Sequence, residues 1–349
     1  PDTLSCNICQ YFCSMKASFK SYELEFKRPA GTSRGILNTK STYLLQVRTS
    51  TSEYTGECGL FKGLSADNET EYENKLQWVC DHIQENKEYL LDSCREFPSI
   101  QFGIEQVFKQ LETGQQESFF PSEFTKGEKG IQINGLIWMG SLDFMREQIQ
   151  QKLEQKYSCI KLKIGVNWKE EFKILQNLRT EFPASQLELR VDANGGFTYE
   201  QAPGVLEQLA ELNIHSIEQP IKAGQEKQMA DLCRTTPIPI ALDEELIGKF
   251  YMKQKEELLE KINPQYIILK PSLVGGWQGS KEWIDLAEKQ NTGWWITSAL
   301  ESNIGLNAIA QWTFALGNKM PQGLGTGSLF TNNFPSRLEV RGEQLFYNP

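Results

Sequence analysis

The sequence predicts an α/β fold in which a barrel of parallel strands follows a smaller α+β domain. Three observations support this prediction. The chain has 349 residues, more than a typical single domain. The pattern of apolar and polar residues changes near residue 130. From residue 131 onward, short apolar runs alternate with amphipathic helical stretches, which is typical of βα units and a parallel sheet. The apolar runs recur at a regular spacing, which indicates a (β/α) barrel.

Residues 15–130 are predicted to form the α+β domain. The segments ASFKSYELEF (17–26) and TYLLQVRT (42–49) alternate between polar and apolar residues, as antiparallel strands do. The intervening KRPAGTSRGILNTK (27–40) is rich in Gly, Ser, Thr and basic residues and is predicted to be a loop. Helical periodicity predicts helices in NETEYENKLQWVCDHIQENKEYLLDSC (68–94) and IQFGIEQVFKQLE (100–112).

Residues 131–329 are predicted to form the barrel. The expected strands are IQINGLIWMG (131–140), CIKLKIG (159–165), LELRVDA (187–193), IHSIEQP (214–220), IPIALDE (238–244), YIILKPSLV (266–274), WWITSAL (294–300) and QGLGTG (322–327). The expected helices cover residues 141–155, 169–182, 198–212, 226–236, 280–290 and 303–316. The last segment, 330–349, is strand-like and is predicted to return to the first domain.

The chain is acidic, with a formal net charge of -9, and it has only 2 histidines. An acidic chain without a basic run is a poor candidate for binding nucleic acid or an anionic membrane. No apolar stretch approaches the length of a membrane span, and the N-terminus lacks the apolar core of a signal peptide. We therefore expect a cytoplasmic protein. The oligomeric state is not encoded in any pattern of the sequence.

Cys6, Cys9 and Cys13 invite a metal interpretation, because Cys-x-x-Cys is half of a zinc site. No second pair or nearby histidine completes four ligands. Incidental cysteines in a disordered tail over residues 1–14 are therefore favoured, with Met15 as a natural start.

The run CIKLKIG contains two lysines in an otherwise apolar strand. Residues two apart in a strand share a face, so Lys161 and Lys163 must enter the same space. Each of the next strands closes with a charged residue, about one βα repeat after the last: Asp192, Glu218, Asp243 and Lys270. Because the active sites of such barrels form at the carboxyl ends of the strands, these side chains are expected to meet at one mouth.

The three carboxylates are predicted to bind a divalent metal. Three carboxylates at one point would repel one another without a cation between them, and oxygen ligands favour Mg²⁺, for which Mn²⁺ can substitute. The paired lysines on one side and Lys270 on the other would flank the metal-bound ligand. Adjacent cations lower the pKa of a lysine, so a neutral amine is expected to act as a general base.

Each of these residues also has an ordinary explanation. A lone carboxylate at a strand end is usually a loop residue, and a strand lysine usually lies at an edge with its ammonium group in water. The combination of paired lysines, three carboxylates at successive strand ends and a further lysine would rarely arise together. It favours catalysis.

Five motifs resemble the enolase superfamily, in the subgroup that is similar to muconate lactonising enzymes: KLK (161–163), VDANGG (191–196), IEQP (217–220), ALDE (241–244) and LKPSLVGG (269–276). The resemblance extends over nearly the whole chain. It implies a modified (β/α)7β TIM-type barrel with an α+β capping domain. It also implies Asp192, Glu218 and Asp243 as Mg²⁺ ligands, and Lys163 and Lys270 on opposite faces of a bound carboxylate. The shared step is abstraction of the proton α to that carboxylate, giving an enediolate stabilised by the metal.

Within this subgroup, INGLIWMG, TSALESNIGLNAIAQW, GLGTGSLF and SRGIL resemble the dehydratases of menaquinone synthesis. The likeness implies syn-dehydration of a cyclohexadiene carboxylate, with Lys163 as base. It also suggests that Ser298, Ser302 and Asn303 line the substrate pocket. Arg34 is a candidate for holding a substrate carboxylate, although a surface arginine without function is an equal alternative.

Two other residues are candidates for supporting roles. Asn194 shares strand parity with Asp192 and would orient ligands, although a turn-forming Asn before Gly195 is an equal interpretation. Glu244 would pair with a lysine or face solvent.

Other functions stay open at this point. Dipeptide epimerases and N-acylamino acid racemases share the central residues, but the epimerases typically carry an Asp-x-Asp pair near the last strands, which is absent after residue 290. A mandelate-racemase-like site would need a histidine at the barrel mouth, whereas His215 has the wrong parity and is expected to face the outer helices. An inactive barrel acting as a scaffold is the non-enzymatic alternative.

Overall fold

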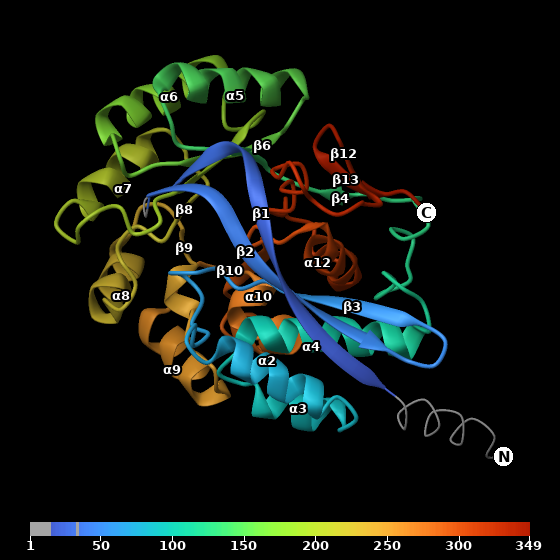
Figure 1. Ribbon diagram of the computed structural model, residues 1–349. Coiled ribbons are helices and arrows are strands. Elements are labelled where there is room, and N and C mark those ends of the chain that lie inside the picture. The colour runs from blue at the N-terminus through green and yellow to red at the C-terminus, as the bar shows by residue number, and fades with distance from the viewer. Residues whose placement is uncertain (1–14, 33–34) are drawn as a thin grey trace.

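The N-terminal region is built on a three-stranded antiparallel sheet, formed by β1 (Lys16–Thr32), β2 (Gly35–Arg48) and β3 (Glu53–Cys58). The computed structural model describes residues 15–32 and 35–349. β1 and β2 form a long hairpin that passes across the molecule in front of the barrel (Figure 1). The predicted loop at 27–40 is therefore wrong, because strand pairing resumes from Ala30 to Thr32 after an irregularity. Pairing uses backbone groups, which polar side chains do not block.

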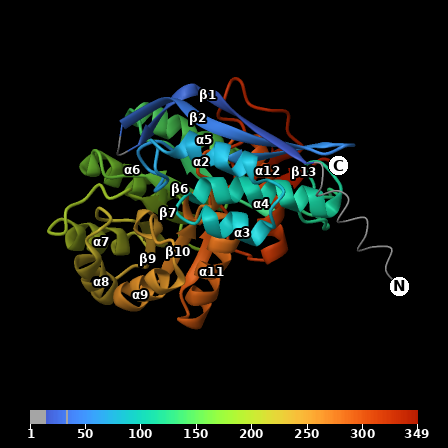
Figure 2. The same cartoon turned by 60° about the horizontal axis from the view of Figure 1, so that its bottom comes forward.

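Three helices pack beside this sheet: α2 (Tyr72–Asp81), α3 (Lys87–Ser93) and α4 (Pro98–Thr113). They lie close together below the hairpin in Figure 2. The helical segment predicted over residues 68–94 forms two helices, because Asn86 accepts a hydrogen bond from the backbone of Tyr89 and starts α3. β3 packs tightly on α4, because a Cβ added at Gly56 would lie 2.2 Å from the carbonyl oxygen of Gly103.

The central sheet has seven parallel strands in the order β11-β10-β9-β8-β7-β6-β5. Their bounds are β5 Gly135–Ile137, β6 Cys159–Lys163, β7 Glu188–Asp192, β8 Ser216–Glu218, β9 Ile240–Leu242, β10 Tyr266–Leu269 and β11 Gly293–Ile296. The predicted eighth strand at 322–327 is reduced to two parallel bridges, Ile133 with Gln322 and Thr297 with Gly323. These bridges link the two edges of the sheet and curl it into a barrel. Glycines at 323, 325 and 327 explain why no longer strand forms there.

Helices follow most of the strands and cover the outside of the sheet (Figure 1). Ser141 caps α5 by accepting a hydrogen bond from the backbone of Phe144. α9 was not predicted from the sequence, because its segment is dominated by charged residues. The bounds are α5 Leu142–Glu154, α6 Trp168–Glu181, α7 Ala202–Glu211, α8 Glu226–Thr235, α9 Met252–Ile262, α10 Pro271–Val274, α11 Gly276–Lys289 and α12 Asn303–Leu316, with a 3₁₀ turn at Glu244–Leu246.

The C-terminal segment makes two kinds of contact. Strands β12 (Leu338–Arg341) and β13 (Gln344–Tyr347) form a small sheet with β4 (Ile131–Gln132). Just before them, Phe330 bridges to Phe26 on β1. This segment therefore contacts the N-terminal sheet, while its own strands pair at the start of the barrel region. The domain boundary near residue 130 stays a prediction.

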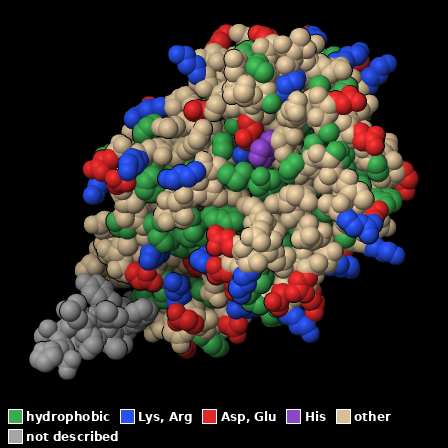
Figure 3. All heavy atoms as spheres, turned by 180° about the vertical axis from the view of Figure 1, so that it is seen from behind, with side chains coloured by type: hydrophobic (Ala, Val, Ile, Leu, Met, Phe, Trp, Pro, Cys, Tyr) green, Lys and Arg blue, Asp and Glu red, His purple; other side chains and the backbone are tan. Residues whose placement is uncertain are grey.

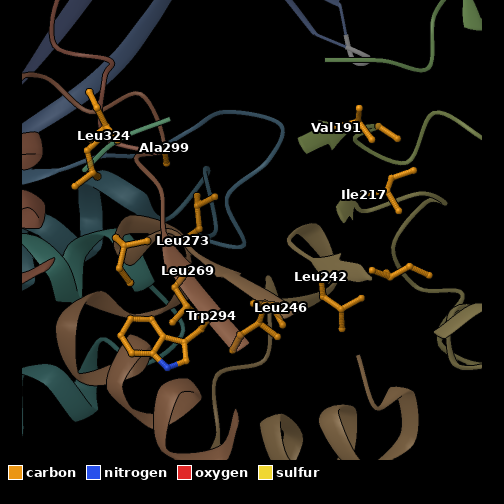
Figure 4. Close-up of a cluster of buried hydrophobic side chains, with 14 of the residues drawn as sticks. Val191, Ile217, Leu242, Leu246, Leu269, Leu273, Trp294, Ala299 and Leu324 are labelled. Carbon is orange, nitrogen blue, oxygen red and sulfur yellow. The ribbon is translucent and has the colours of Figure 1, made fainter. Parts of the chain in front are cut away.

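The core lies mainly between the strands and the outer helices. Figure 4 shows buried side chains from neighbouring strands, among them Val191, Ile217, Leu242 and Leu269, arranged along the curled sheet. These residues alternate with the charged residues of the same strands, which therefore point to the other face.

The outer surface shows no single dominant feature on the face in Figure 3. Charged side chains of both signs are scattered there between small apolar patches. Within residues 15–32 and 35–349, no helix has the length and apolar character needed to cross a membrane.

Candidate active site

The strand register brings the predicted charged residues together. Lys163 on β6 is paired with Asp192 on β7, and Asp192 is paired with Glu218 on β8. Asp243 and Lys270 directly follow β9 and β10. All of these side chains therefore lie at the carboxyl ends of adjacent parallel strands.

Lysines and carboxylates alternate across this end of the barrel. The Nζ of Lys161 donates to Oδ2 of Asp192 at 3.1 Å and to Oε2 of Glu218 at 2.7 Å. The Nζ of Lys163 donates to the same Oδ2 of Asp192 at 2.6 Å. On the other side, Lys270 donates to Asp243, and its Nζ is 3.9 Å from Oε1 of Glu218. The side chains of the three carboxylates are at most 3% exposed.

The close carboxylates decide how the lysines titrate. Burial alone would lower the pKa of Lys161, but the charges of Glu218 and Asp192 outweigh burial and raise it above its ordinary value. Lys270 behaves in the same way, with Asp243 as the main partner that raises its pKa. Each of these two ammonium groups lies nearer to carboxylates than to other lysines, so the carboxylate charges outweigh those of the neighbouring lysines. The expected lowering of a lysine pKa by adjacent cations, a bound metal ion among them, stays a prediction.

The carboxylates themselves respond differently. Burial would raise the pKa of Asp192, but Lys163 and Lys161 hold it well below its usual range. Burial and the nearby charge of Asp192 raise the pKa of Glu218 to about 8. Two adjacent carboxylates thus differ because one faces two lysines more closely than the other.

The donor set fits a hard divalent cation. Among the described residues, no three Asp, Glu, His or Cys side chains are already gathered around one point, since these carboxylates face lysine ammonium groups. However, Oε1 of Glu218 is buried and accepts no hydrogen bond, which leaves a carboxylate oxygen for a cation. Three buried carboxylates from successive strands match the all-oxygen ligation that Mg²⁺ and Mn²⁺ prefer.

Asn194 links Lys163 to Glu244. Its Oδ1 accepts from Nζ of Lys163 at 2.7 Å, and its Nδ2 donates to Oε1 of Glu244 at 2.9 Å. The backbone of Asn194 has a positive φ of 44°, and its N–H donates to Oδ1 of Asp192. The turn-forming and orienting roles of Asn194 are therefore compatible, since this one residue makes both sets of contacts.

A cavity of about 240 Å³ lies beside these residues. Its walls include Lys161, Lys163, Lys270 and Asn194, together with Ser298 after β11. The hydroxyl of Ser298 hydrogen bonds to that of Thr326 at 2.6 Å. Of the serine and asparagine residues predicted to line the pocket, only Ser298 does so.

Ser302 and Asn303 are placed elsewhere, which corrects their predicted position. Ser302 caps α12, and its hydroxyl donates to Oε2 of Glu57 at 2.6 Å. Asn303 donates through Nδ2 to the carbonyl oxygen of Phe334 at 2.6 Å. Both residues lie at the start of α12, where the side chain of Ser302 caps the helix and that of Asn303 bonds to a distant backbone, so neither lines the cavity.

Some of the predicted residues cannot be placed. Arg34 and the cysteines of the first 14 residues, Cys6, Cys9 and Cys13, lie outside the described residues.

His215 does not face the outer helices as predicted. The centroid of its ring lies 5.4 Å from that of Tyr266 and 6.5 Å from that of Trp295. The parity argument fails because His215 precedes β8 and is not part of the strand.

Several cavity residues were missed from the sequence. Lys152 and Gln148 come from α5, and Phe61 and Leu64 come from the segment after β3. No motif distinguishes them, because helix and loop residues of this kind are common on protein surfaces. Their role depends on which helix and which loop reach the cavity.

Comparison with known proteins agrees with this geometry. Residues 144–345 match the family model described as enolase C-terminal domain-like. An o-succinylbenzoate synthase of Desulfotalea psychrophila is 44% identical over an alignment that covers 95% of this chain and 98% of the relative.

Solved structures show the same relationship. The crystal structure of MenC from Desulfotalea psychrophila has a TM-score of 0.85 and 40% identity, and covers 95% of this chain and 99% of the other. A dipeptide epimerase from Enterococcus faecalis has a TM-score of 0.81 at 15% identity, covering 96% and 97% of the two chains, and shows the fold alone. The chain belongs to the enolase superfamily, in the family of o-succinylbenzoate synthases.

Proposed function

We propose that the chain catalyses the syn-dehydration of 2-succinyl-6-hydroxy-2,4-cyclohexadiene-1-carboxylate to o-succinylbenzoate, a step of menaquinone biosynthesis. The observation that carries this proposal is the 44% identity to an o-succinylbenzoate synthase over nearly the full length of both chains. The cluster of lysines and carboxylates at the carboxyl end of the barrel supports it. We further propose a cytoplasmic enzyme that acts on a small-molecule carboxylate.

Lys163 is proposed as the base. Its Nζ lines the cavity, and its side chain is 11% exposed, so a bound substrate can reach it. The amine takes the proton α to the ring carboxylate and then gives a proton to the hydroxyl that departs from the same face. The C–H and C–OH bonds break, water leaves, and the new double bond completes the aromatic ring. Asn194 positions the amine through its 2.7 Å hydrogen bond.

Lys270 is proposed to act from the opposite side of the substrate. It follows β10, whereas Lys163 ends β6, and three strands separate them in the sheet. Its ammonium group stabilises the negative charge that develops on the substrate, and it can contact the ring face. Lys161, which bonds to both Asp192 and Glu218, holds these carboxylates in position.

Enzymes of the enolase superfamily generally use a divalent metal. We propose Mg²⁺ here, held by Asp192, Glu218 and Asp243, with Mn²⁺ as a substitute. A cation held by these carboxylates would supply positive charge that stabilises an anionic substrate carboxylate.

The test is conversion of the cyclohexadiene precursor by the purified protein with Mg²⁺. We expect the aromatic product to accumulate, and Lys163→Ala to abolish the elimination. Lys173→Ala is a matched control, because Lys173 is exposed on α6 and pairs only with Glu170 among the described residues. If the wild-type protein makes no aromatic product, the proposed function is wrong.

A racemase or epimerase is the second candidate. An N-succinylamino acid racemase of Thermus thermophilus is 31% identical over 45% of this chain and 40% of its own length. Racemisation needs one base on each face of the substrate, and Lys163 and Lys270 can supply one each. Two measurements separate racemisation from dehydration: the rate of α-proton exchange of N-acylamino acids and dipeptides in D₂O, and the kcat/KM for dehydration of the precursor. We expect dehydration to be far more efficient.

A further inference from the structure

The cavity contains a fourth lysine that the proposed chemistry does not use. Lys152, on α5, lines the same cavity as Lys161, Lys163 and Lys270. Among the residues that the structure describes, the cavity walls include these four lysines and no Asp or Glu side chain. The cavity therefore suits a ligand with more than one negative charge.

Lys152 differs from the other three lysines in its surroundings. Each of the others pairs with a carboxylate of the strand ends, whereas Lys152 forms no ion pair within the described part of the chain. Its Nζ lies 4.7 Å from the centre of the Tyr157 ring, and its stem lies against Gly135. Burial lowers its pKa.

This arrangement leaves the ammonium group of Lys152 without a carboxylate partner in the part of the chain that the structure describes. A half-buried ammonium group loses part of its hydration, and an aromatic face replaces only a part of that loss. A carboxylate supplied by a ligand would complete the site through a charge-assisted hydrogen bond. The nearby amide of Gln148 is held at both ends by the backbone of Trp138 and carries no charge to balance that of the ammonium group.

We propose that Lys152 binds the carboxylate at the end of the succinyl chain, while the ring carboxylate lies between Lys163 and Lys270. This assignment rests on the proposed function, because only a dicarboxylate substrate needs two separate cationic sites. Lys152 is a specificity residue and takes no part in proton transfer. The glycine at position 135 leaves room for the stem of Lys152, since a Cβ at residue 135 would lie 3.1 Å from Cγ and Cδ of Lys152.

The experiment compares two ligands of the Mg²⁺-loaded protein by titration calorimetry. o-Succinylbenzoate has both carboxylates, and 2-butyrylbenzoate has a methyl group in place of the distal one. The wild-type protein should prefer o-succinylbenzoate by at least about tenfold, as expected for a hydrogen bond between charged groups. In Lys152→Met this preference should fall to about one, with 2-butyrylbenzoate bound within about twofold of wild type.

Two further variants sharpen the test. Lys152→Glu places a negative charge at the site and should reverse the preference. Arg146→Met removes a positive charge from the same helix at a side chain that is 60% exposed, and should keep the wild-type preference. In steady-state kinetics, Lys152→Met should raise KM for the precursor and leave kcat nearly unchanged, because the distal carboxylate is remote from the reacting carbon.

An unchanged preference for o-succinylbenzoate in Lys152→Met or Lys152→Glu overturns the assignment. A failure of the proposed function looks different. In that case the wild-type protein does not convert the precursor, whichever ligand it binds.

Discussion

Two lysines on one face of β6 are tolerated because each meets a carboxylate from the neighbouring strand. Lys161 bonds to Asp192 and Glu218, and Lys163 bonds to Asp192 and Asn194. Buried ion pairs of this kind cost desolvation energy and are a weak source of stability. Stability alone therefore does not explain these pairs, which agrees with the catalytic role proposed above.

Glu218→Gln tests the metal site at the scale of one residue. The amide keeps the size and one oxygen but removes a charge, and it cannot use the buried Oε1 as an anionic ligand. We expect Mg²⁺ affinity to fall more than about tenfold and turnover to fall with it, while the fold persists. Mg²⁺ titration and precursor kinetics measure both. Glu207→Gln, at an exposed position on α7, is the control and should resemble wild type.

Asp67 offers a test of pH dependence. Its carboxyl is buried, Oδ2 has no hydrogen-bond partner, and burial raises its pKa to about 7 from an ordinary value of 3.8. A folded-state pKa that is raised contributes stability below the unfolded pKa, and this contribution is lost as the pH rises toward the folded pKa.

Asp67→Asn removes this titration. The free energy of unfolding of the variant relative to wild type should increase as the pH rises from about 4, by on the order of 4 kcal/mol in total, and should level off above about pH 7. Urea unfolding at pH 5 and pH 8 measures the change. An equal difference at both pH values would contradict the raised pKa.

At the scale of elements, the N-terminal region is joined to the barrel by buried polar contacts. Glu57 on β3 accepts hydrogen bonds from the backbone of Ser302 and Gly305 at the start of α12. A carboxylate at this end of a helix is favourable, because the first N–H groups of the helix lack partners within it. Phe61, four residues later, lines the cavity. Docking of β3 on α12 therefore also positions one wall of the candidate site.

Two glycines make a matched test of element packing. Gly56→Ala should lower the free energy of unfolding by several kcal/mol, because the new Cβ would lie 2.2 Å from a backbone oxygen of α4. Gly204→Ala, in α7, should raise it by about 0.5–1 kcal/mol, since no atom lies within 4 Å of its added Cβ and alanine favours helix. Chemical denaturation measures both. A destabilised Gly204→Ala would contradict the open space described there.

At the scale of the whole molecule, the candidate site exists only when the barrel is closed. Its charged residues run from 161 to 270 and come from five successive strands. An unfolded chain cannot gather them, so a metal that binds them must bind the folded state preferentially.

Removal of metal should therefore affect stability as well as activity. We expect excess chelator to abolish dehydration, and Mg²⁺ to raise the Tm of the metal-free wild-type protein in a concentration-dependent manner. Differential scanning calorimetry with and without Mg²⁺ measures the shift. Glu218→Gln should show a much smaller shift, which separates specific binding from a general effect of salt. Full turnover in a verified metal-free preparation would contradict the proposed mechanism.

The sequence by itself determined the parallel barrel, its charged strand ends and the family. The two-residue period of β6 placed Lys161 and Lys163 on one face, and the βα repeat placed Asp192, Glu218, Asp243 and Lys270 at the ends of the following strands. These features depend on local periodicity and on the fixed geometry of parallel strands, both of which can be read along the chain.

Only the tertiary structure decided which other residues meet these charges. It extended the hairpin through a predicted loop, reduced the eighth strand to two bridges, and moved Ser302 and Asn303 away from the cavity. It also placed two carboxylates beside Lys161, which raise its pKa, and brought Lys152 from α5 to the cavity. The physical reason is that pairing across strands, electrostatic balance and cavity walls depend on distances between residues far apart in the chain. Local sequence patterns do not contain those distances.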